Sequence, residues 1–202
     1  MSGLVAARPI GSNGDMAKPP PTIDHPTLPR VKAAFPDVKL LASEFRGQTT
    51  LVVPHAALHK VMHYLREDPE CDYDFLSDVT AVDYLGYPAE TPGRFAVVYI
   101  LASGSHGHRL TVKTFLDPSV DTSGKEPDPA LEVHTVTDIW PGVEWREREV
   151  YDMFGIRFTN HPDLRRILTW ESFPAHPLRK DYPLRGRGER EMYRVLERED
   201  SR

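Results

Sequence analysis

Histidine offers the widest metal-binding and acid–base chemistry of any side chain in this sequence, and nine histidines are present. His55, His59 and His63 recur every four residues and would lie along one side of a helix. Two histidines at this spacing can share a zinc ion, and a protease signature adds a glutamate after the first. Ala56 and Lys60 stand after the first two histidines, and the lysine charge repels a metal ion. The pattern therefore favours a solvated helix edge over a metal site.

The other nucleophilic or metal-binding candidates are isolated. His106 and His108 lie in the turn-like stretch "SGSHGH", with no third ligand nearby in the sequence. Cys71 is the single cysteine, and the acids around it in "EDPECDYDF" raise the pKa of a thiol, which indicates an ordinary thiol. One cysteine also excludes an internal disulfide, a cysteine-rich zinc site and an iron–sulfur cluster held by this chain alone.

In "EWREREVYDMFG" the acidic side chains alternate with arginines, so the charges along the stretch alternate in sign. At helical spacing Glu144 reaches Arg148, Arg148 reaches Asp152, and Arg146 meets Glu149. A catalytic acid or base must escape such neutralisation, so a paired-carboxylate active site is disfavoured. No glycine-rich phosphate loop and no Gly-x-Ser-x-Gly elbow occurs. We therefore expect no catalytic, cofactor-binding or metal-binding residues in this chain.

The elements that position these residues follow from apolar periodicity. Residues 28–35, 54–68 and 141–154 read as helices, and strands are expected at 38–45, 48–54, 73–85, 94–103 and 108–116. The order of these elements predicts an α+β fold: a two-layer sandwich of a mixed β-sheet with helices on one face.

Within the two longer helices we expect a single apolar face to pack on the sheet. The residues of these faces are Leu58, Val61, Met62 and Leu65, and then Val143, Val150 and Phe154. Gly155 is expected to end the last helix in a left-handed conformation. Glu147, Arg148 and Asp152 would form an ion network toward the residues that follow.

Charge and proline content divide the chain into three parts. Residues 1–26 read as a flexible head, 27–160 as the α+β domain, and 161–202 as an extended Pro/Arg-rich strap with a charged tail. The formal net charge is −5, yet the strap is mildly basic. The longest apolar run, Phe95 to Ala102, is too short to cross a bilayer, and the head lacks the apolar core of a signal peptide. We expect a protein that is soluble or peripheral to a membrane and kept in the cytoplasm.

The strap repeats one pattern, His-Pro followed by a leucine and paired basic residues, at His161 and again at His176. Three interpretations compete: a metal or catalytic histidine site, a nucleic-acid arm, or a segment that docks on another protein. Acidic residues within the strap and an acidic body disfavour a nucleic acid. Prolines reduce the entropy lost on docking, and leucines and arginines supply apolar contacts and carboxylate partners. Docking on a protein needs the fewest assumptions.

The stretch "EREVYDMFGIRFTNHPDLRRIL", followed by "HPLRKDYPL", is similar to the C-subunit family of NADH:quinone oxidoreductase, respiratory complex I. The matching signature consists of Glu147, Arg148, Glu149, Asp152, Met153, Phe154, His161, Arg165, Ile167 and Leu168. The resemblance covers about Val31 to Leu184 and leaves the first 25 or so residues unmatched. It implies a scaffold without a cofactor, peripheral on the cytoplasmic side of the cell membrane, in a proton-translocating complex.

The resemblance also implies partners. The D subunit, which forms the quinone pocket with the B subunit, would receive this chain, while FMN, iron–sulfur clusters and quinone belong to the partners. Because the chain ends at Arg202, the C and D subunits are expected to be separate. The expected docking residues are Glu147, Arg148, Glu149, Asp152, His161, Arg165, Arg166, His176, Arg179 and Lys180.

Within this set, Arg165, Arg166, Arg179 and Lys180 are expected to pair with carboxylates of the D subunit. Two alternatives to the assignment are open. The nearer one is an equivalent component of a membrane-bound hydrogenase or of another quinone- or phenazine-reducing complex. The more distant one is a nucleic-acid-binding adaptor.

Overall fold

The computed structural model describes residues 23–119 and 128–189. The predicted flexible head lies mostly outside these residues, and so does the charged tail after residue 189. The described chain begins with helix α1, Thr27–Ala34, where a short helix was expected. Among the described residues, no helix has the length and apolar character that crossing a bilayer requires.

A tight hairpin follows, made of strands β1, Leu41–Phe45, and β2, Gln48–Val52. The turn between them is Arg46-Gly47, and both residues have positive φ angles, 51° and 75°. Two consecutive positive φ angles match the right-handed twist of the flanking strands, which is why such a turn closes a hairpin well.

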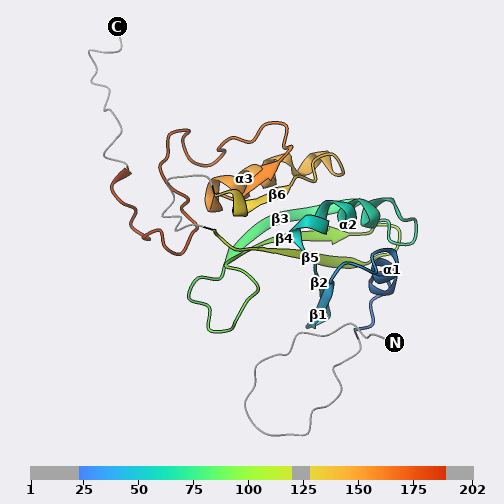
Figure 1. Ribbon diagram of the computed structural model, residues 1–202. Coiled ribbons are helices and arrows are strands. Elements are labelled where there is room, and N and C mark those ends of the chain that lie inside the picture. The colour runs from blue at the N-terminus through green and yellow to red at the C-terminus, as the bar shows by residue number, and fades with distance from the viewer. Residues whose placement is uncertain (1–22, 120–127, 190–202) are drawn as a thin grey trace, which may run out of the picture.

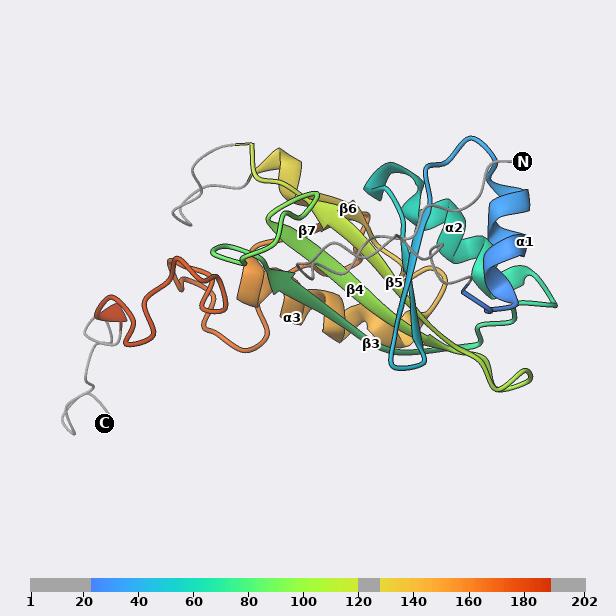
Figure 2. The ribbon, with the colours of Figure 1, turned by 90° about the horizontal axis from the view of Figure 1, so that it is seen from below.

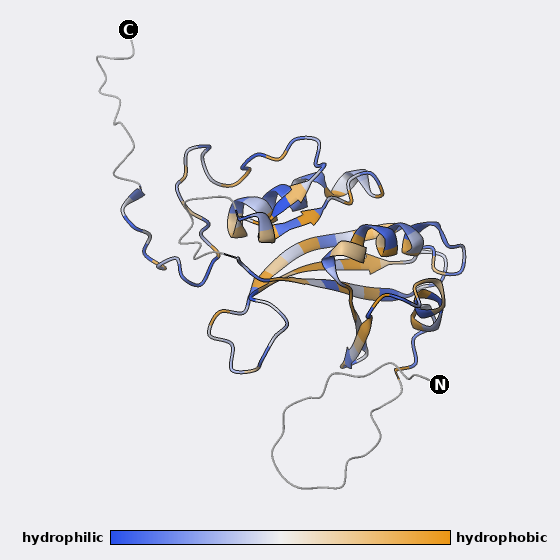
Figure 3. Ribbon diagram, in the orientation of Figure 1, coloured by the Kyte–Doolittle hydropathy of each residue, from blue (hydrophilic) through white to orange (hydrophobic). Residues whose placement is uncertain are grey.

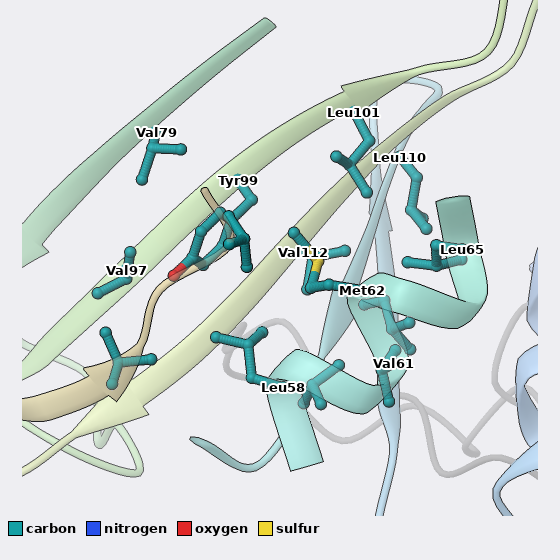
Figure 4. Close-up of a cluster of buried hydrophobic side chains, with 14 of the residues drawn as sticks. Leu58, Val61, Met62, Leu65, Val79, Val97, Tyr99, Leu101, Leu110 and Val112 are labelled. Atoms are coloured by element: carbon teal, nitrogen blue, oxygen red, sulfur yellow. The ribbon is translucent and has the colours of Figure 1, made fainter. Parts of the chain in front are cut away.

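Helix α2, His55–Glu67, begins directly after Pro54. The four residues expected on its inner face, Leu58, Val61, Met62 and Leu65, are all fully buried. They pack against the strands β4 and β5 described next, as Figure 4 shows. The helical period of apolar residues therefore predicted both this helix and the face that it buries.

The remaining strands of the main sheet are β3, Phe75–Asp83, β4, Phe95–Ala102, and β5, Arg109–Leu116. The strand order is β1-β2-β5-β4-β3. Strand β2 pairs with β5 in parallel, while every other pair in this sheet is antiparallel. The sheet is therefore mixed, as predicted. Its register shifts once, between Leu76 and Asp78 on the edge strand β3.

The last part of the domain adds helix α3, Glu144–Phe154, which follows a 3-10 turn, Pro141–Val143. A second 3-10 turn, Pro129–Leu131, leads into β6, Glu132–His134, and β6 pairs in parallel with β7, Arg157–Thr159. The sequence did not predict this small sheet, because three residues are too few to display an alternating pattern.

Helices α2 and α3 and the small sheet lie on the same face of the main sheet, so the fold is the expected two-layer α+β sandwich (Figures 1 and 2). Apolar residues concentrate in the strands, while the segment after β7 is largely hydrophilic (Figure 3). Val143, Val150 and Phe154 of the last helical segment are buried in the core, as predicted.

Candidate docking site

Helix α3 ends at Gly155, which has a φ of 75° and donates its N–H to the carbonyl of Tyr151 at 2.8 Å. This is the left-handed stop that the sequence predicted. The final carbonyls of a helix have no partner within it and need donors from elsewhere. Here the strap supplies three: His176 Nδ1 to the Asp152 carbonyl at 2.9 Å, the Leu178 amide to Met153 at 3.1 Å, and Arg179 Nε to Phe154 at 2.5 Å. The strap therefore caps the C-terminus of α3.

The side chain of Asp152 binds the first part of the strap. Its carboxylate is fully buried and accepts the amides of Ile167, Leu168 and Thr169 at 3.1, 2.8 and 2.8 Å. Thr169 Oγ1 donates to it at 2.5 Å and Arg166 Nη1 at 2.6 Å. Burial alone would raise the pKa of Asp152, but the hydrogen bonds from Thr169 and then from Arg166 hold the pKa at about 2. The carboxylate is therefore ionised and fully partnered.

Arg148 holds the same stretch of the strap from the neighbouring helical turn. Its Nε donates to the carbonyl of Arg165 at 3.1 Å, and its Nη2 donates to the carbonyl of Arg166 at 3.0 Å. The predicted pairs of Arg148 with Glu144 and Asp152 are therefore wrong, because the strap carbonyls take its donors instead. The predicted pair of Arg146 with Glu149 is confirmed at 3.3 Å.

The two His-Pro repeats contact opposite ends of the same helix. His161 Nε2 donates to the carbonyl of Glu144 in the first turn of α3 at 3.1 Å, whereas His176 contacts the last turn. Burial lowers the pKa of His176 to about 4, so this ring is neutral near neutral pH. The repetition in the sequence thus corresponds to two contacts with one helix of the same chain.

The second repeat also fixes the strap to the main sheet. Arg179 is 5 % exposed and lies over the ring of Phe95, with 5.3 Å between the guanidinium carbon and the ring centroid. The Lys180 amide donates to Asp83 Oδ2 at 2.8 Å. Arg94 bridges Asp83 and Asp181, each at 2.9 Å. The end of this repeat and the residue after it are therefore held by β3, β4 and Arg94 as well as by α3.

These contacts correct the expectation for two of the basic docking residues. Arg166 pairs with Asp152 of its own chain, and Arg179 is buried against its own domain, so neither side chain faces outward for a partner's carboxylate. Arg165 does face outward: its side chain is 70 % exposed, and its ion pair among the described residues is with nearby Asp163. Lys180 is exposed too.

Glu147 also differs from the predicted pattern, in which each acidic side chain of α3 has an arginine beside it. It is fully buried and accepts hydrogen bonds from Thr135 Oγ1 at 2.5 Å and from the Val136 amide at 2.9 Å. The His161 ring lies 3.9 Å away, and no lysine or arginine among the described residues pairs with the carboxylate. The expectation that each acid of this helix has a cation beside it is therefore wrong for Glu147.

His59 of α2 contacts side chains outside its own helix. His59 Nε2 lies 2.8 Å from Asp138 Oδ2, and its ring lies 4.1 Å from that of His134. Across residues 23–119 and 128–189, no cluster of three histidine, cysteine or acidic side chains has the geometry to hold a metal ion. Cys71 is buried, and burial together with the charge of Asp68 raises the pKa of its thiol to about 11.

Two solved structures have a similar fold. A structure described as Nqo5 of a trypsin-resistant fragment is similar with a TM-score of 0.56 and 31 % identity, covering 68 % of this chain and 96 % of that one. The second structure is a chain of the membrane-bound sulfane sulfur reductase, an archaeal respiratory membrane complex. Its TM-score is 0.60, and the match covers 85 % of this chain and 92 % of that one. Because the two sequences are only 23 % identical, this similarity shows the fold alone.

Sequence relatives identify the family. The C subunit of NADH-quinone oxidoreductase from Roseiflexus castenholzii is 45 % identical over 163 residues, 80 % of this chain and 86 % of the relative. The one from Geobacter sulfurreducens is 41 % identical, covering 82 % of this chain and 92 % of its own. The family described as the 30 kDa subunit of respiratory-chain NADH dehydrogenase matches residues 51–188. The chain belongs to this family, as the signature predicted.

Gly155→Ala tests whether the strap requires a glycine at the end of α3. A Cβ there would contact the His176 ring and the Arg179 guanidinium, in addition to the strain of about 1–2 kcal/mol for a left-handed residue. Gly47→Ala is the matched control, since Gly47 has the same φ of 75° and nothing within 4 Å of its Cβ position. Urea unfolding of the full chain should show a larger loss of stability for Gly155→Ala, and trypsin should cleave its strap faster. Equal losses would contradict the contact.

Asp152→Asn tests the buried carboxylate. The substitution leaves Arg166 without its counter-charge and turns one acceptor into a donor, so we expect a loss of about 3–5 kcal/mol at neutral pH. The pKa of Asp152 in the folded chain lies below its ordinary value. Its contribution to the free energy of unfolding is therefore present above pH 3.8 and is lost as the pH falls toward 2. The Asp152→Asn variant should lack this pH dependence. Asp163→Asn, at an exposed pair with Arg165, should change stability little. Similar losses in both variants would overturn the assignment.

Proposed function

We propose that this chain acts as the C subunit of an NADH-quinone oxidoreductase, as a scaffold without a cofactor or active site of its own. The observation that carries this proposal is that Asp152, Arg148 and Gly155 all contact the strap. These residues engage the strap rather than a cavity, and the ionised Asp152 is surrounded by donors. A carboxylate whose lone pairs are engaged in this way is unsuited to acid–base catalysis.

The outward face of the strap supplies the docking surface in this proposal. Leu168, Leu178 and Leu184 are 63, 54 and 103 % exposed, although the backbone of the first two is held by α3. Apolar side chains on a fixed backbone lose little conformational entropy when a partner covers them. Exposed basic side chains, Arg165 and Lys180, stand beside them to meet carboxylates.

The partners in this proposal are the D and B subunits of the same complex, which would hold the quinone site. FMN and iron–sulfur clusters would lie in other subunits, and the complex would place this chain at the cytoplasmic side of the membrane. The relatives' name supports this assignment, since they match over more than four fifths of their own length.

Leu168→Asp in the assembled complex tests the proposal. The strap backbone does not depend on this exposed side chain, so the isolated chain should keep its unfolding temperature. Retention of the tagged chain with its partners should fall at least about tenfold, equivalent to about 1.4 kcal/mol. NADH:quinone turnover per assembled complex should stay unchanged. Leu85→Asp, at a leucine that is 43 % exposed on the β3–β4 connection, is the matched control and should assemble normally.

Two outcomes would overturn the proposal. Normal assembly of Leu168→Asp would remove the strap from the interface. Normal subunit stoichiometry with turnover reduced more than about tenfold would mean that this chain contributes to the chemistry and is not merely a scaffold.

A further inference from the structure

Glu147 is a buried carboxyl group without a cation. Its side chain has no solvent exposure, and within residues 23–119 and 128–189 neither a lysine nor an arginine pairs with it. Its neighbour on α3, Arg148, directs its donors to the strap carbonyls instead. Burying an unpaired carboxylate is costly, and such a group commonly remains protonated.

His161 does not provide the missing charge. Its Nε2 donates to the carbonyl of Glu144, and its Nδ1 accepts the amide of Asp163 at 3.1 Å. A ring nitrogen that accepts a hydrogen bond carries no proton, so this arrangement is that of a neutral imidazole. The 3.9 Å approach of His161 to Glu147 is therefore a contact between a ring and a carboxyl group and not an ion pair.

Few donors around Glu147 stabilise its charged form. The buried hydroxyl of Tyr99 on β4 has no hydrogen-bond partner among the described residues, so it does not donate to Glu147. Burial raises the pKa of Glu147 to about 7, the hydrogen bonds from Thr135 and Val136 offset this only in part, and the charge of Asp138 raises it further.

Two threonine hydroxyls connect this carboxyl to the surface. Glu147 Oε2 lies 2.5 Å from Thr135 Oγ1, and Thr135 Oγ1 lies 2.9 Å from Thr137 Oγ1. Thr135 is buried and Thr137 is half-buried. Each hydroxyl can donate one hydrogen bond while accepting another, so the chain can run in either direction.

We propose that Glu147 is a proton-binding site of the folded chain, and that it exchanges its proton with solvent through Thr135 and Thr137. In the protonated form the Glu147 O–H donates to Thr135, whose hydroxyl donates to Thr137. On release, the carboxyl proton moves to Thr135 Oγ1, the former Thr135 hydroxyl proton moves to Thr137 Oγ1, and the former Thr137 hydroxyl proton passes to solvent water, so that both hydroxyls then donate toward the carboxylate. The site binds a proton independently of any partner.

The pH dependence has a defined sign. The folded chain holds this proton more tightly than the unfolded chain, whose glutamate releases it near pH 4.5. The stabilising contribution is therefore complete below about pH 4.5 and is lost as the pH rises toward about 7. His176 has the opposite effect in an overlapping range, since its folded pKa is lowered to about 4, so the contribution of Glu147 must be isolated by substitution.

Carbon-13 NMR of the full chain labelled at glutamate side-chain carboxyls tests the site directly. One resonance should titrate with a midpoint near pH 7 and should be missing from Glu147→Gln. Thr137→Val should leave that midpoint in place and slow the proton exchange of the same resonance. All glutamates titrating at or below about pH 5 would overturn the proposal, and unchanged exchange in Thr137→Val would remove the hydroxyl route.

Thermal unfolding provides the second measurement. Glu147→Gln imitates the protonated form, so between about pH 5 and about pH 7 the unfolding temperature of the wild type should fall relative to this variant. Glu149→Gln is the control, since Glu149 lies on the same helix at an exposed pair with Arg146 and should follow the wild type. Parallel profiles for the wild type and Glu147→Gln would contradict the proposal. If Glu147→Gln does not fold, the wild-type NMR titration decides alone.

Discussion

The rest of this structure depends on the hydrogen bonds and the ion pair that the buried carboxylate of Asp152 makes with the strap. A charge without solvent must be met by donors, and three consecutive amides of the strap, a hydroxyl and the Arg166 guanidinium meet it. Those donors reach the Asp152 carboxylate only if residues 166–169 lie against the last turns of α3. The helix and the strap therefore form one unit, although the strap has neither helix nor strand from residue 161 to 188.

This unit explains how an irregular segment can present a fixed surface. Backbone groups of the strap point inward to α3 and to Asp83, while Leu168 and Arg165 point outward. The carbonyls at the end of α3 would otherwise be unsatisfied, so the strap completes the helix as much as the helix holds the strap. This arrangement suits a scaffold, because its partner meets a surface that is already ordered.

The sequence predicted the parts of the fold that depend on local periodicity. Leu58 and Leu65 marked the inner face of α2, and Gly155 marked the end of α3, because a helical period and a left-handed stop are local properties. The small β6–β7 sheet and the contacts of Arg148 were not predictable, since they depend on residues more than fifteen positions away. Helical spacing predicted acidic partners for Arg148. In the structure Arg148 donates to carbonyls of the strap instead, and no lysine or arginine of the described residues pairs with Glu147.

Native-state hydrogen exchange of the isolated full chain tests most directly whether α3 and the strap form one unit. The amides of Leu168 and Thr169, which donate to Asp152, should exchange within about tenfold of the rate at Val150 inside α3, because one cooperative opening would expose them all. Exchange of Leu168 and Thr169 at the rate of an unstructured peptide, with Val150 still protected, would show that the strap is not part of the folded unit and would contradict the account.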